Sequence, residues 1–361
     1  MSVARGEARN AIVGVMGENP LSPMTSSEIA SLVEEKSGTV LTASTVRSCL
    51  NLNTPGLFTR IERGKFILSD ALARVEKEDL GKSRIYHADC LKWMRVAPRE
   101  SISAVVTDPP YGLVEYSEPE KGKLRRGHGG VWRIPPNLDG YKRSPMPRFT
   151  TLTDEQRRGL YLFFEQFTEA LIPLLVPGAH VMMASNPLLS HIVGSALEAG
   201  GLERRGVIIR LVQTLRGGDR PKNHEVEYPD VTVMPRSQWE PWLLYRKPFE
   251  GTVADNLAQW GTGALRRVDD AHPFGDVIRS SPTTSAERKL APHPSLKPQA
   301  LMRQLVRASL PLGDGIVLDP FAGSGSTLAA ANSVGYRSVG IESDMDYFNM
   351  AIESIPRLTA L

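Results

Sequence analysis

A short segment at residues 108–111 combines residue types that could bind a planar amino group. Asp108 is followed by Pro109, Pro110 and Tyr111, directly after the apolar run 103–107. Each proline fixes its own φ and lacks an N–H, so the turn is stiff and its carbonyl groups can accept hydrogen bonds. The Asp108 carboxylate and the Pro109 carbonyl could accept the two hydrogens of an exocyclic amine while Tyr111 stacks on the ring that carries it. The alternative is a plain turn with a helix-capping acid.

A second chemical segment lies more than 200 residues further along the chain. Residues 315–327 run from an apolar strand pattern through a glycine turn into a helical pattern. The glycines let the backbone pass close to a ligand, and the start of the helix favours a carboxylate or another anion. The next apolar run ends at Glu342, placed to accept hydrogen bonds from ribose hydroxyls. The candidate cofactor-binding residues of this segment are Asp319, Pro320, Phe321, Gly323, Gly325, Ser326 and Thr327.

Together the two segments resemble motifs of the amino-directed DNA methyltransferases, which methylate adenine N6 or cytosine N4. In that family, Asp-Pro-Pro-Tyr binds the target amine and Asp-Pro-Phe-x-Gly-x-Gly binds S-adenosylmethionine. The segment 293–298, His-Pro-Ser-Leu-Lys-Pro, resembles the motif just upstream of the cofactor loop. The resemblance assigns Ser295 and Lys297 to the methionine end of the cofactor, and we expect His293 to make a local hydrogen bond instead of acting as a catalyst. It covers about residues 84–352.

The order of these motifs resembles the circularly permuted, beta-type branch of the family, in which the catalytic half precedes the cofactor half. The resemblance implies an α/β fold with a doubly wound, mostly parallel, Rossmann-like methyltransferase sheet. The sheet would be interrupted between Glu342 and Arg84, which would make Asp89 a candidate partner for the adenine amine of the cofactor. A strand-end helix cap is the alternative role for Asp89. Residues 249–292 fall where the permuted family places target recognition.

The resemblance implies a sequence-specific DNA methyltransferase acting on a base flipped out of the helix. Aspartate at the first motif position is commoner among the adenine enzymes and serine among the cytosine N4 enzymes, so we expect adenine N6, with cytosine N4 as the alternative. The amine attacks the sulfonium methyl directly, and no metal or catalytic cysteine is required. Amide-directed relatives carry Asn in place of Asp108, which argues against a protein substrate. A non-enzymatic DNA-binding regulator would require a lost motif residue, and none is missing.

Basic residues gather after Tyr111. Between residues 121 and 148 there are eight Lys or Arg against one acid, interleaved with aromatic residues. We expect this basic insert, residues 112–150, to hold DNA phosphates beside the flipped base, a solvated loop being the alternative. The loop 216–224 is a second basic candidate. The candidate DNA-binding residues are Lys121, Lys123, Arg125, Arg126, Trp132, Arg133, Lys142, Arg143, Arg216, Arg220, Lys222 and, in an N-terminal module, Arg47.

Residues 1–75 have the pattern of a separate, winged-helix-like module. Helical patterns cover 8–16, 27–35 and 43–50, and residues 57–68 alternate around Arg63-Gly64 as a hairpin would. The third helix, with Arg47, could enter a DNA groove, and docking to a protein is the alternative. Residues 76–83 are expected to be a linker, followed by the methyltransferase domain at 84–361.

From residue 84 onward, short apolar runs alternate with helical patterns, which predicts a mostly parallel sheet with helices on both faces. An amphipathic helix is expected at 160–175, followed by a turn at Val176-Pro177-Gly178. Strands are expected at 84–87, 102–107, 180–184, 206–211, 241–246, 315–318 and 337–341.

Composition limits the remaining possibilities. A chain of 361 residues can form one large domain and one small one. No apolar stretch approaches the roughly 20 residues needed to cross a bilayer, and no signal peptide is visible, so a cytoplasmic location is expected. Cys49 and Cys90 lack metal-ligand spacing, which argues against a zinc site or a disulfide framework. The expected partner is double-stranded DNA, and a cognate restriction endonuclease and a homodimer are both consistent with the resemblance.

Overall fold

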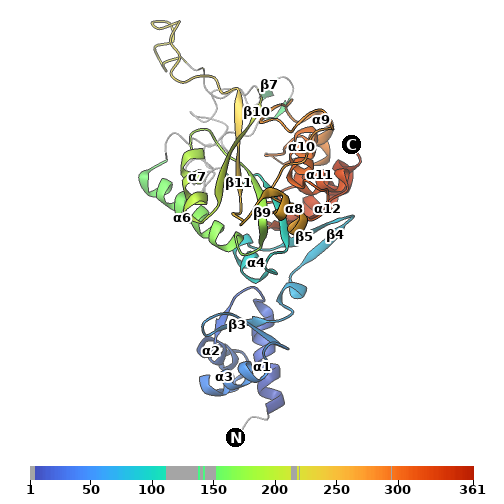
Figure 1. Cartoon of the computed structure of the whole chain (residues 1–361). Coiled ribbons are helices and arrows are strands. Elements are labelled where there is room, and N and C mark those ends of the chain that lie inside the picture. The colour runs from blue at the N-terminus through green and yellow to red at the C-terminus, as the bar shows by residue number, and fades with distance from the viewer. Residues whose placement is uncertain are drawn as a thin grey trace.

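The computed structural model describes residues 5–110, 137–138, 141–142, 152–212, 218, 220–293 and 295–361. In this part of the chain the main domain is built on a nine-stranded sheet of order β12-β10-β11-β9-β6-β13-β14-β5-β4 (Figure 1). Its strands are β4 (Lys77–Leu80), β5 (Ser83–His87), β6 (Ile102–Thr107), β9 (Leu175–Ala184), β10 (Glu203–Leu211), β11 (Trp239–Arg246), β12 (Val277–Arg279), β13 (Ile316–Asp319) and β14 (Arg337–Glu342). All the predicted strands are present, and β4 and β12 are additional to them.

The sheet is mostly parallel, as predicted. β9, β6, β13, β14 and β5 are consecutive parallel neighbours, and β10 and β12 are also parallel. β11 runs antiparallel to both of its neighbours, and β4 runs antiparallel to β5. β14, near the end of the chain, pairs with β5, near the start of the main domain. This adjacency confirms that the sheet is circularly permuted. The expected interruption between Glu342 and Arg84 was wrong, because the strands that carry these residues are hydrogen-bonded neighbours.

Helices cover both faces of the sheet because its central strands are apolar on both sides. In β6, Val105 packs with Phe164 and Phe167 on one face, while Ala104 and Val106 belong to a second core on the other. The fold is therefore the doubly wound α/β arrangement that the resemblance implied. The helices of the main domain are α4 (Cys90–Val96), α6 (Asp154–Leu171), α7 (Ser190–Ala199), α8 (Val253–Trp260), α9 (Ser285–Leu290), α10 (Gln299–Ser309), α11 (Ser326–Val334) and α12 (Met345–Thr359).

The boundaries predicted for the helix at 160–175 were wrong. A capping box between Thr153 and Gln156 starts α6 at Asp154 instead. The helix ends at Leu171, and β9 begins at Leu175, which pairs with Ile102. The expected turn at residues 176–178 therefore lies inside β9, at an irregularity in its register with β6.

The N-terminal part has its own hydrophobic core, which includes Ile12, Ile29, Val46, Phe58 and Phe66. It contains three helices and a hairpin in the predicted order, and one short strand, β1, completes a sheet of order β1-β3-β2. Its relationship to winged-helix domains stays a prediction. The elements are α1 (Arg5–Glu18), β1 (Met24–Thr25), α2 (Ser26–Ser37), α3 (Ala43–Leu52), β2 (Phe58–Glu62) and β3 (Lys65–Leu68).

The expected linker at residues 76–83 is part of the main sheet, so that prediction was wrong. Residues 77–80 form the edge strand β4, which pairs with β5 and thereby moves the start of the main domain from residue 84 back to about 77. Its charged side chains resemble those of a linker because an edge strand faces solvent. Just before it, the 3-10 helix η1 (Ala71–Arg74) leads to Val75, which packs with Leu21 in the main core. The two parts of the chain therefore share apolar contacts.

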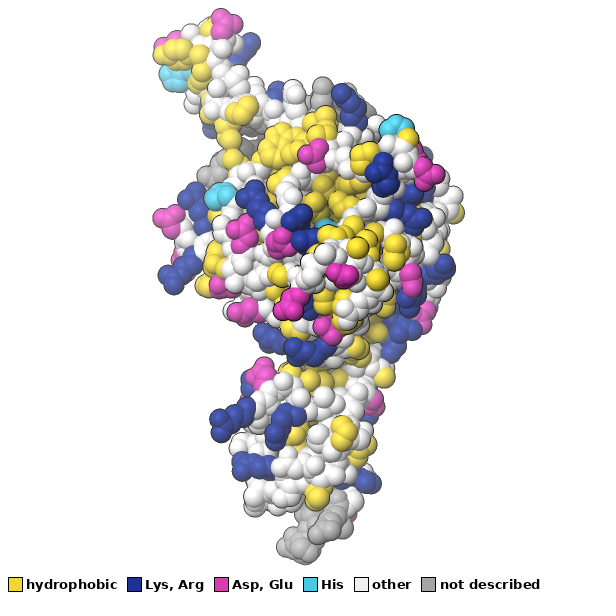
Figure 2. Space-filling model, viewed as in Figure 1, with side chains coloured by type: hydrophobic (Ala, Val, Ile, Leu, Met, Phe, Trp, Pro, Cys, Tyr) yellow, Lys and Arg dark blue, Asp and Glu magenta, His cyan; other side chains and the backbone are white. Residues whose placement is uncertain are grey.

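Two further segments lie near the same end of the sheet in Figure 1. Of the basic insert, the structure describes the backbone of β7 (Asn137–Leu138) and β8 (Tyr141–Lys142), which pair antiparallel. Residues 220–236, between β10 and β11, project as an arm whose tip carries hydrophobic side chains among charged ones (Figure 2). Val226 on this arm is 94% exposed. No helix among the described residues has the length and apolar character needed to cross a membrane.

Candidate active site

The predicted site residues follow four neighbouring parallel strands. Asp108 follows β6, Asp319 ends β13, Glu342 ends β14, and Asp89 lies just after β5. Because carboxyl ends of parallel strands meet at one edge of a sheet, segments far apart in the chain converge there. The Ala88 N–H donates to the Glu342 carbonyl at 2.9 Å. This hydrogen bond joins the end of β14 to the segment that follows β5.

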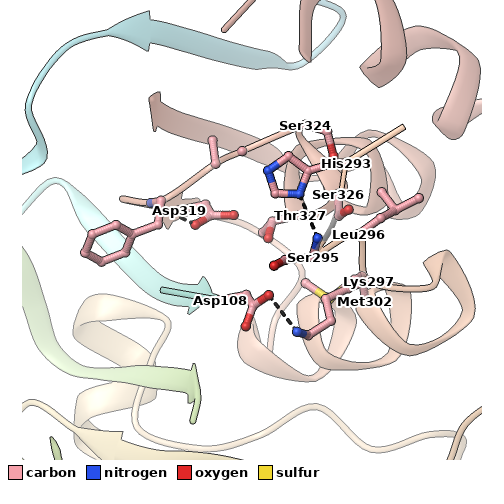
Figure 3. A pocket seen from close by; sticks show the side chains of 13 residues that line it. Asp108, His293, Ser295, Leu296, Lys297, Met302, Asp319, Ser324, Ser326 and Thr327 are labelled. Carbon is pink, nitrogen blue, oxygen red and sulfur yellow. Dashed lines mark hydrogen bonds and ion pairs between the residues drawn. The ribbon is translucent and has the colours of Figure 1, made fainter. Parts of the chain in front are cut away.

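A pocket at this edge unites the three motifs (Figure 3). Its lining also includes residues that sequence reasoning did not select, among them Met302 and Ser324. Pro109 is buried and Pro110 is exposed next to the pocket residue Asp108, whereas Tyr111 lies outside the described residues. The predicted site residues that line the pocket are Asp108, Ser295, Lys297, Asp319, Phe321, Gly323, Ser326 and Thr327.

The glycine loop requires glycine at two positions for different reasons. Gly323 has a φ of 51°, and a Cβ there would lie 3.3 Å from Nε2 of His293, which also lines the pocket. Gly325 has a φ of 83°, and a Cβ there would collide with Ile355 of α12. Gly323 thus keeps the pocket open, while Gly325, which caps α11, lets that helix pack against α12.

Glu342 holds the glycine loop through its backbone. Its Oε2 accepts the Gly323 N–H at 2.8 Å, and its Oε1 accepts the Asp344 N–H at 2.8 Å. Burial raises the pKa of this carboxyl above its ordinary value. The expected contact with ribose hydroxyls stays a prediction, and the structure adds a loop-holding role that sequence reasoning missed.

Asp89 caps a helix in this structure. Its Oδ1 accepts the Lys92 N–H at 2.9 Å at the start of α4. This is the structural role that the sequence left open as the alternative. The contact between Asp89 and the adenine amine of a cofactor stays a prediction.

His293 makes the local hydrogen bond that we expected. Its Nδ1 accepts the Ser295 N–H at 3.2 Å, and its ring makes a T-shaped contact with Tyr347, with centroids 4.4 Å apart. Burial, aided by the charge of Lys297, lowers the pKa of His293 to about 4. The imidazole is therefore neutral at neutral pH and shapes the pocket wall beside Gly323. Ser295 is exposed at the pocket.

Lys297 makes a contact that sequence reasoning missed. Its Nζ lies 2.6 Å from Oδ2 of Asp108 and 3.1 Å from Oε1 of Glu240, which comes from β11. On the neighbouring strand β10, Arg210 Nη1 lies 2.9 Å from Oε2 of Glu240. Lys297 lines the expected pocket, but its ammonium is paired with the candidate catalytic carboxylate. A detectable signal was the presence of charged residues within the apolar runs that form β10 and β11.

Asp319 is a buried carboxyl at the bottom of the pocket. Its Oδ1 accepts a hydrogen bond from Thr107 Oγ1 at 2.6 Å and another from the Phe321 N–H at 3.1 Å. Burial raises its pKa to about 6, against an ordinary 3.8. The folded state therefore binds this proton more tightly than the unfolded state does. Between these two values the contribution of Asp319 to stability falls as the pH rises.

Asp319→Asn should make stability less dependent on pH, because asparagine cannot ionise. The thermal midpoint of the variant, measured relative to that of the wild type, should rise as the pH is raised from about 4 to about 7. Asp230→Asn, at an exposed position in the arm, is the control. A difference for Asp319→Asn that is equal at the two pH values would contradict the raised pKa.

The candidate DNA-binding residues are only partly described. Arg47 on α3 and Arg220 and Lys222 at the base of the arm are exposed. Only the backbone of Lys142, in β8, is described. The candidate target-recognition segment 249–292 contains α8, α9 and β12, which extends the sheet beside β10. Lys121, Lys123, Arg125, Arg126, Trp132, Arg133, Arg143 and Arg216 lie outside the described residues.

Comparisons with known proteins identify relatives of this chain. A family model described as DNA methylase, of the N6 and N4 type, matches residues 218–353. The chain is 44% identical over 287 residues to DNA adenine methyltransferase YhdJ of Escherichia coli K12, covering 75% of this chain and 82% of that protein. It is 32% identical over 267 residues to the type II methyltransferase M2.LlaDCHI of Lactococcus lactis subsp. cremoris, covering 74% and 87%.

Among solved structures, a complex of M1.HpyAVI with S-adenosylmethionine is 18% identical, with a TM-score of 0.46 over 76% of this chain and 98% of that one. The two sequence relatives above extend over most of the main domain and over most of their own lengths. With the motifs gathered in one pocket, these matches show that the chain belongs to the amino-directed DNA methyltransferases, the N6-adenine and N4-cytosine DNA methylases.

Proposed function

We propose that this chain transfers a methyl group from S-adenosylmethionine to N6 of adenine in double-stranded DNA. The observation that carries the proposal is that Asp108 and the glycine loop around Gly323 line the same pocket. Aspartate at the first motif position supports adenine over cytosine. The 44% identity to a protein named DNA adenine methyltransferase supports the same choice.

The residues of the pocket fit S-adenosylmethionine, the methyl donor of this family. Gly323 leaves room for a ligand where a Cβ would reach His293, and Ser326 and Thr327 at the start of α11 offer N–H groups to a carboxylate. Phe321 presents an aromatic surface that is fixed by stacking on Phe167, with centroids 5.6 Å apart. When bound, the cofactor supplies an electrophilic methyl group.

The chain's own residues must make the target amine reactive. An exocyclic amine on a base is a poor nucleophile because its lone pair is delocalised into the ring. By accepting hydrogen bonds from the two N–H bonds, the Asp108 carboxylate and the Pro109 carbonyl favour the pyramidal nitrogen and stabilise its developing positive charge. The stiff turn fixes both acceptors before the base arrives, which lowers the entropic part of the barrier.

The amine cannot be reached inside a stacked duplex, so the proposal includes extrusion of the target base. Tyr111 would stack on the extruded base. The basic insert, residues 112–150, would contact phosphates around it, and the segment 249–292 would contribute to sequence recognition.

Base-resolved sequencing of modified DNA tests the proposed function. The chain would be expressed in a host that lacks its own DNA methylation, with Asp108→Asn as the control of strongly reduced activity. We expect N6-methyladenine at a fixed sequence motif. N4-methylcytosine at a fixed motif would overturn the choice of base and keep the reaction, whereas unmodified DNA despite soluble expression would overturn the proposed function.

Arg47→Ala tests the proposed DNA contact of α3. The side chain is exposed, and basic side chains are visible on this part of the surface in Figure 2. Loss of one phosphate contact should weaken DNA binding and reduce the slope of log affinity against log salt concentration by about 0.9. Arg9→Ala on α1 is the matched control, since that arginine is also exposed. An unchanged salt slope for Arg47→Ala would favour a protein-docking role for this part of the chain.

A further inference from the structure

Four charged side chains of alternating sign lead away from the pocket. Asp108 contacts Lys297, Lys297 contacts Glu240, and Glu240 contacts Arg210. Figure 3 shows the first of these contacts, with the Lys297 ammonium directed at the Asp108 carboxylate. The four side chains are only 16, 9, 15 and 9% exposed, in that order. These charges therefore interact with little screening by water.

The two charged residues furthest from the pocket, Glu240 and Arg210, are held in place by several contacts. Arg210 and Glu240 are direct cross-strand partners in the β10–β11 ladder. Arg210 also donates from Nε to Ser280 Oγ at 3.2 Å and from Nη2 to Ser281 O at 3.4 Å, just beyond β12. Glu240 is consequently fixed by the sheet and by a guanidinium that is itself fixed on two sides.

The charge of the Lys297 ammonium is stabilised by both of its carboxylate partners. A buried ammonium is costly unless opposite charges offset its loss of hydration. Burial acts to lower the pKa of Lys297, but the charges of Asp108 and Glu240 more than compensate and raise it above the ordinary value. The lysine is therefore positively charged, and its ammonium lies between two carboxylates, one on β11 and one just after β6.

We propose that Glu240 and Arg210 are positioning residues that act on Asp108 through Lys297. Because Glu240 offsets part of the charge of the ammonium, Lys297 fixes the Asp108 carboxylate without neutralising it. Without Glu240, the ammonium would pair with Asp108 alone and compete with the target amine for its negative charge. This inference rests on the proposed function, because it assigns Asp108 to the target amine.

A second arginine–glutamate pair provides a matched control. Glu203 and Arg246 are also direct partners in the same β10–β11 ladder, with Arg246 Nη2 2.7 Å from Oε2 of Glu203. This pair lies at the opposite end of the two strands from Arg210 and Glu240. Glu203→Gln therefore removes the same type of ion pair from the same strands without touching Lys297.

The test compares steady-state methylation by Glu240→Gln, Glu203→Gln and the wild type. For Glu240→Gln we expect kcat to fall about tenfold to a hundredfold, as for a misplaced catalytic group, with KM for S-adenosylmethionine nearly unchanged. Arg210→Met should act in the same direction, and Arg210→Lys should restore part of the loss because it keeps the charge beside Glu240. Glu203→Gln should keep the wild-type kcat.

A double-mutant cycle tests whether the effect passes through Lys297. In a Lys297→Met background, adding Glu240→Gln should cause no further loss of kcat. Full additivity, or wild-type kcat in Glu240→Gln alone, would overturn the inference. If Glu240→Gln does not fold, Glu240→Asp is the second variant. It keeps the buried charge but withdraws the carboxylate from Lys297 by one carbon, so kcat should fall in the same direction by a smaller factor, and wild-type kcat would overturn the inference. A folded wild-type protein that methylates no DNA would contradict the proposed function, and this inference with it.

Discussion

Asp108→Asn should lower kcat for DNA methylation by about 100- to 1000-fold, the range seen when one preorganised electrostatic group is removed from an active site. Asparagine keeps the shape of the side chain and one carbonyl acceptor, but it has no negative charge to stabilise the developing cation on the amine. The substitution also removes one of the two carboxylates that pair with Lys297 and leaves the other, Glu240. Calorimetry should show nearly unchanged binding of S-adenosylmethionine, since Asp108 is assigned to the amine.

The control for this experiment is Asp79→Asn. Asp79 also pairs with a cation, Arg84, at 2.6 Å, but on the exposed edge of the sheet in β4. Exposed ion pairs contribute little to stability, so this variant should methylate like the wild type. Near-normal turnover by Asp108→Asn on cognate DNA would contradict the assigned chemistry.

The parts of the site that could be predicted are those whose residues lie close together in the sequence. A buried parallel strand requires a continuous apolar run, and its polar termination marks the edge where ligands bind. Asp108, Asp319 and Glu342 each follow such a run, so both their positions and their shared edge were predictable. The order of the motifs predicted the permutation, but β14 pairs directly with β5 where an interruption of the sheet was expected.

Contacts between distant segments could not be predicted in the same way. Lys297 and Asp108 are 189 residues apart, and their contact depends on how α10 packs against the sheet. The Arg210–Glu240 pair depends on the register of an antiparallel strand inserted into a parallel sheet. A shift of one residue would move either side chain to the opposite face. Their presence within apolar strands indicated a buried partner without identifying it.

The two wrong boundaries arose from local composition. The charged residues at 76–83 suggested a linker, yet an edge strand tolerates them because one side of it faces solvent. The apolar residues at 172–175 extended the helical pattern of α6, yet the pairing of Leu175 with Ile102 assigns them to the approach to β9. In both cases tertiary pairing outweighed the local pattern.

Gly323→Val should reduce affinity for S-adenosylmethionine by more than about tenfold, or about 1.4 kcal/mol in binding free energy. A Cβ at this position lies 3.3 Å from the His293 ring, and the two further methyl groups of valine would extend into the pocket or displace the loop. Displacement would also disturb the 2.8 Å hydrogen bond from the Gly323 N–H to Glu342. Both routes weaken the cofactor site without changing Asp108.

The strain of a branched residue at positive φ must be separated from the loss of the site. Gly335→Val is the matched control, because Gly335 also has a positive φ, 83°, and its nearest neighbour to an added Cβ is Lys82 Nζ at 3.9 Å. Both variants should lose stability from a left-handed valine, by about 1–2 kcal/mol. Only Gly323→Val should lose cofactor affinity in calorimetry at a temperature where both are folded. Wild-type affinity in Gly323→Val would remove Gly323 from the cofactor site, and an equal loss of affinity in both variants would attribute the effect to backbone strain alone.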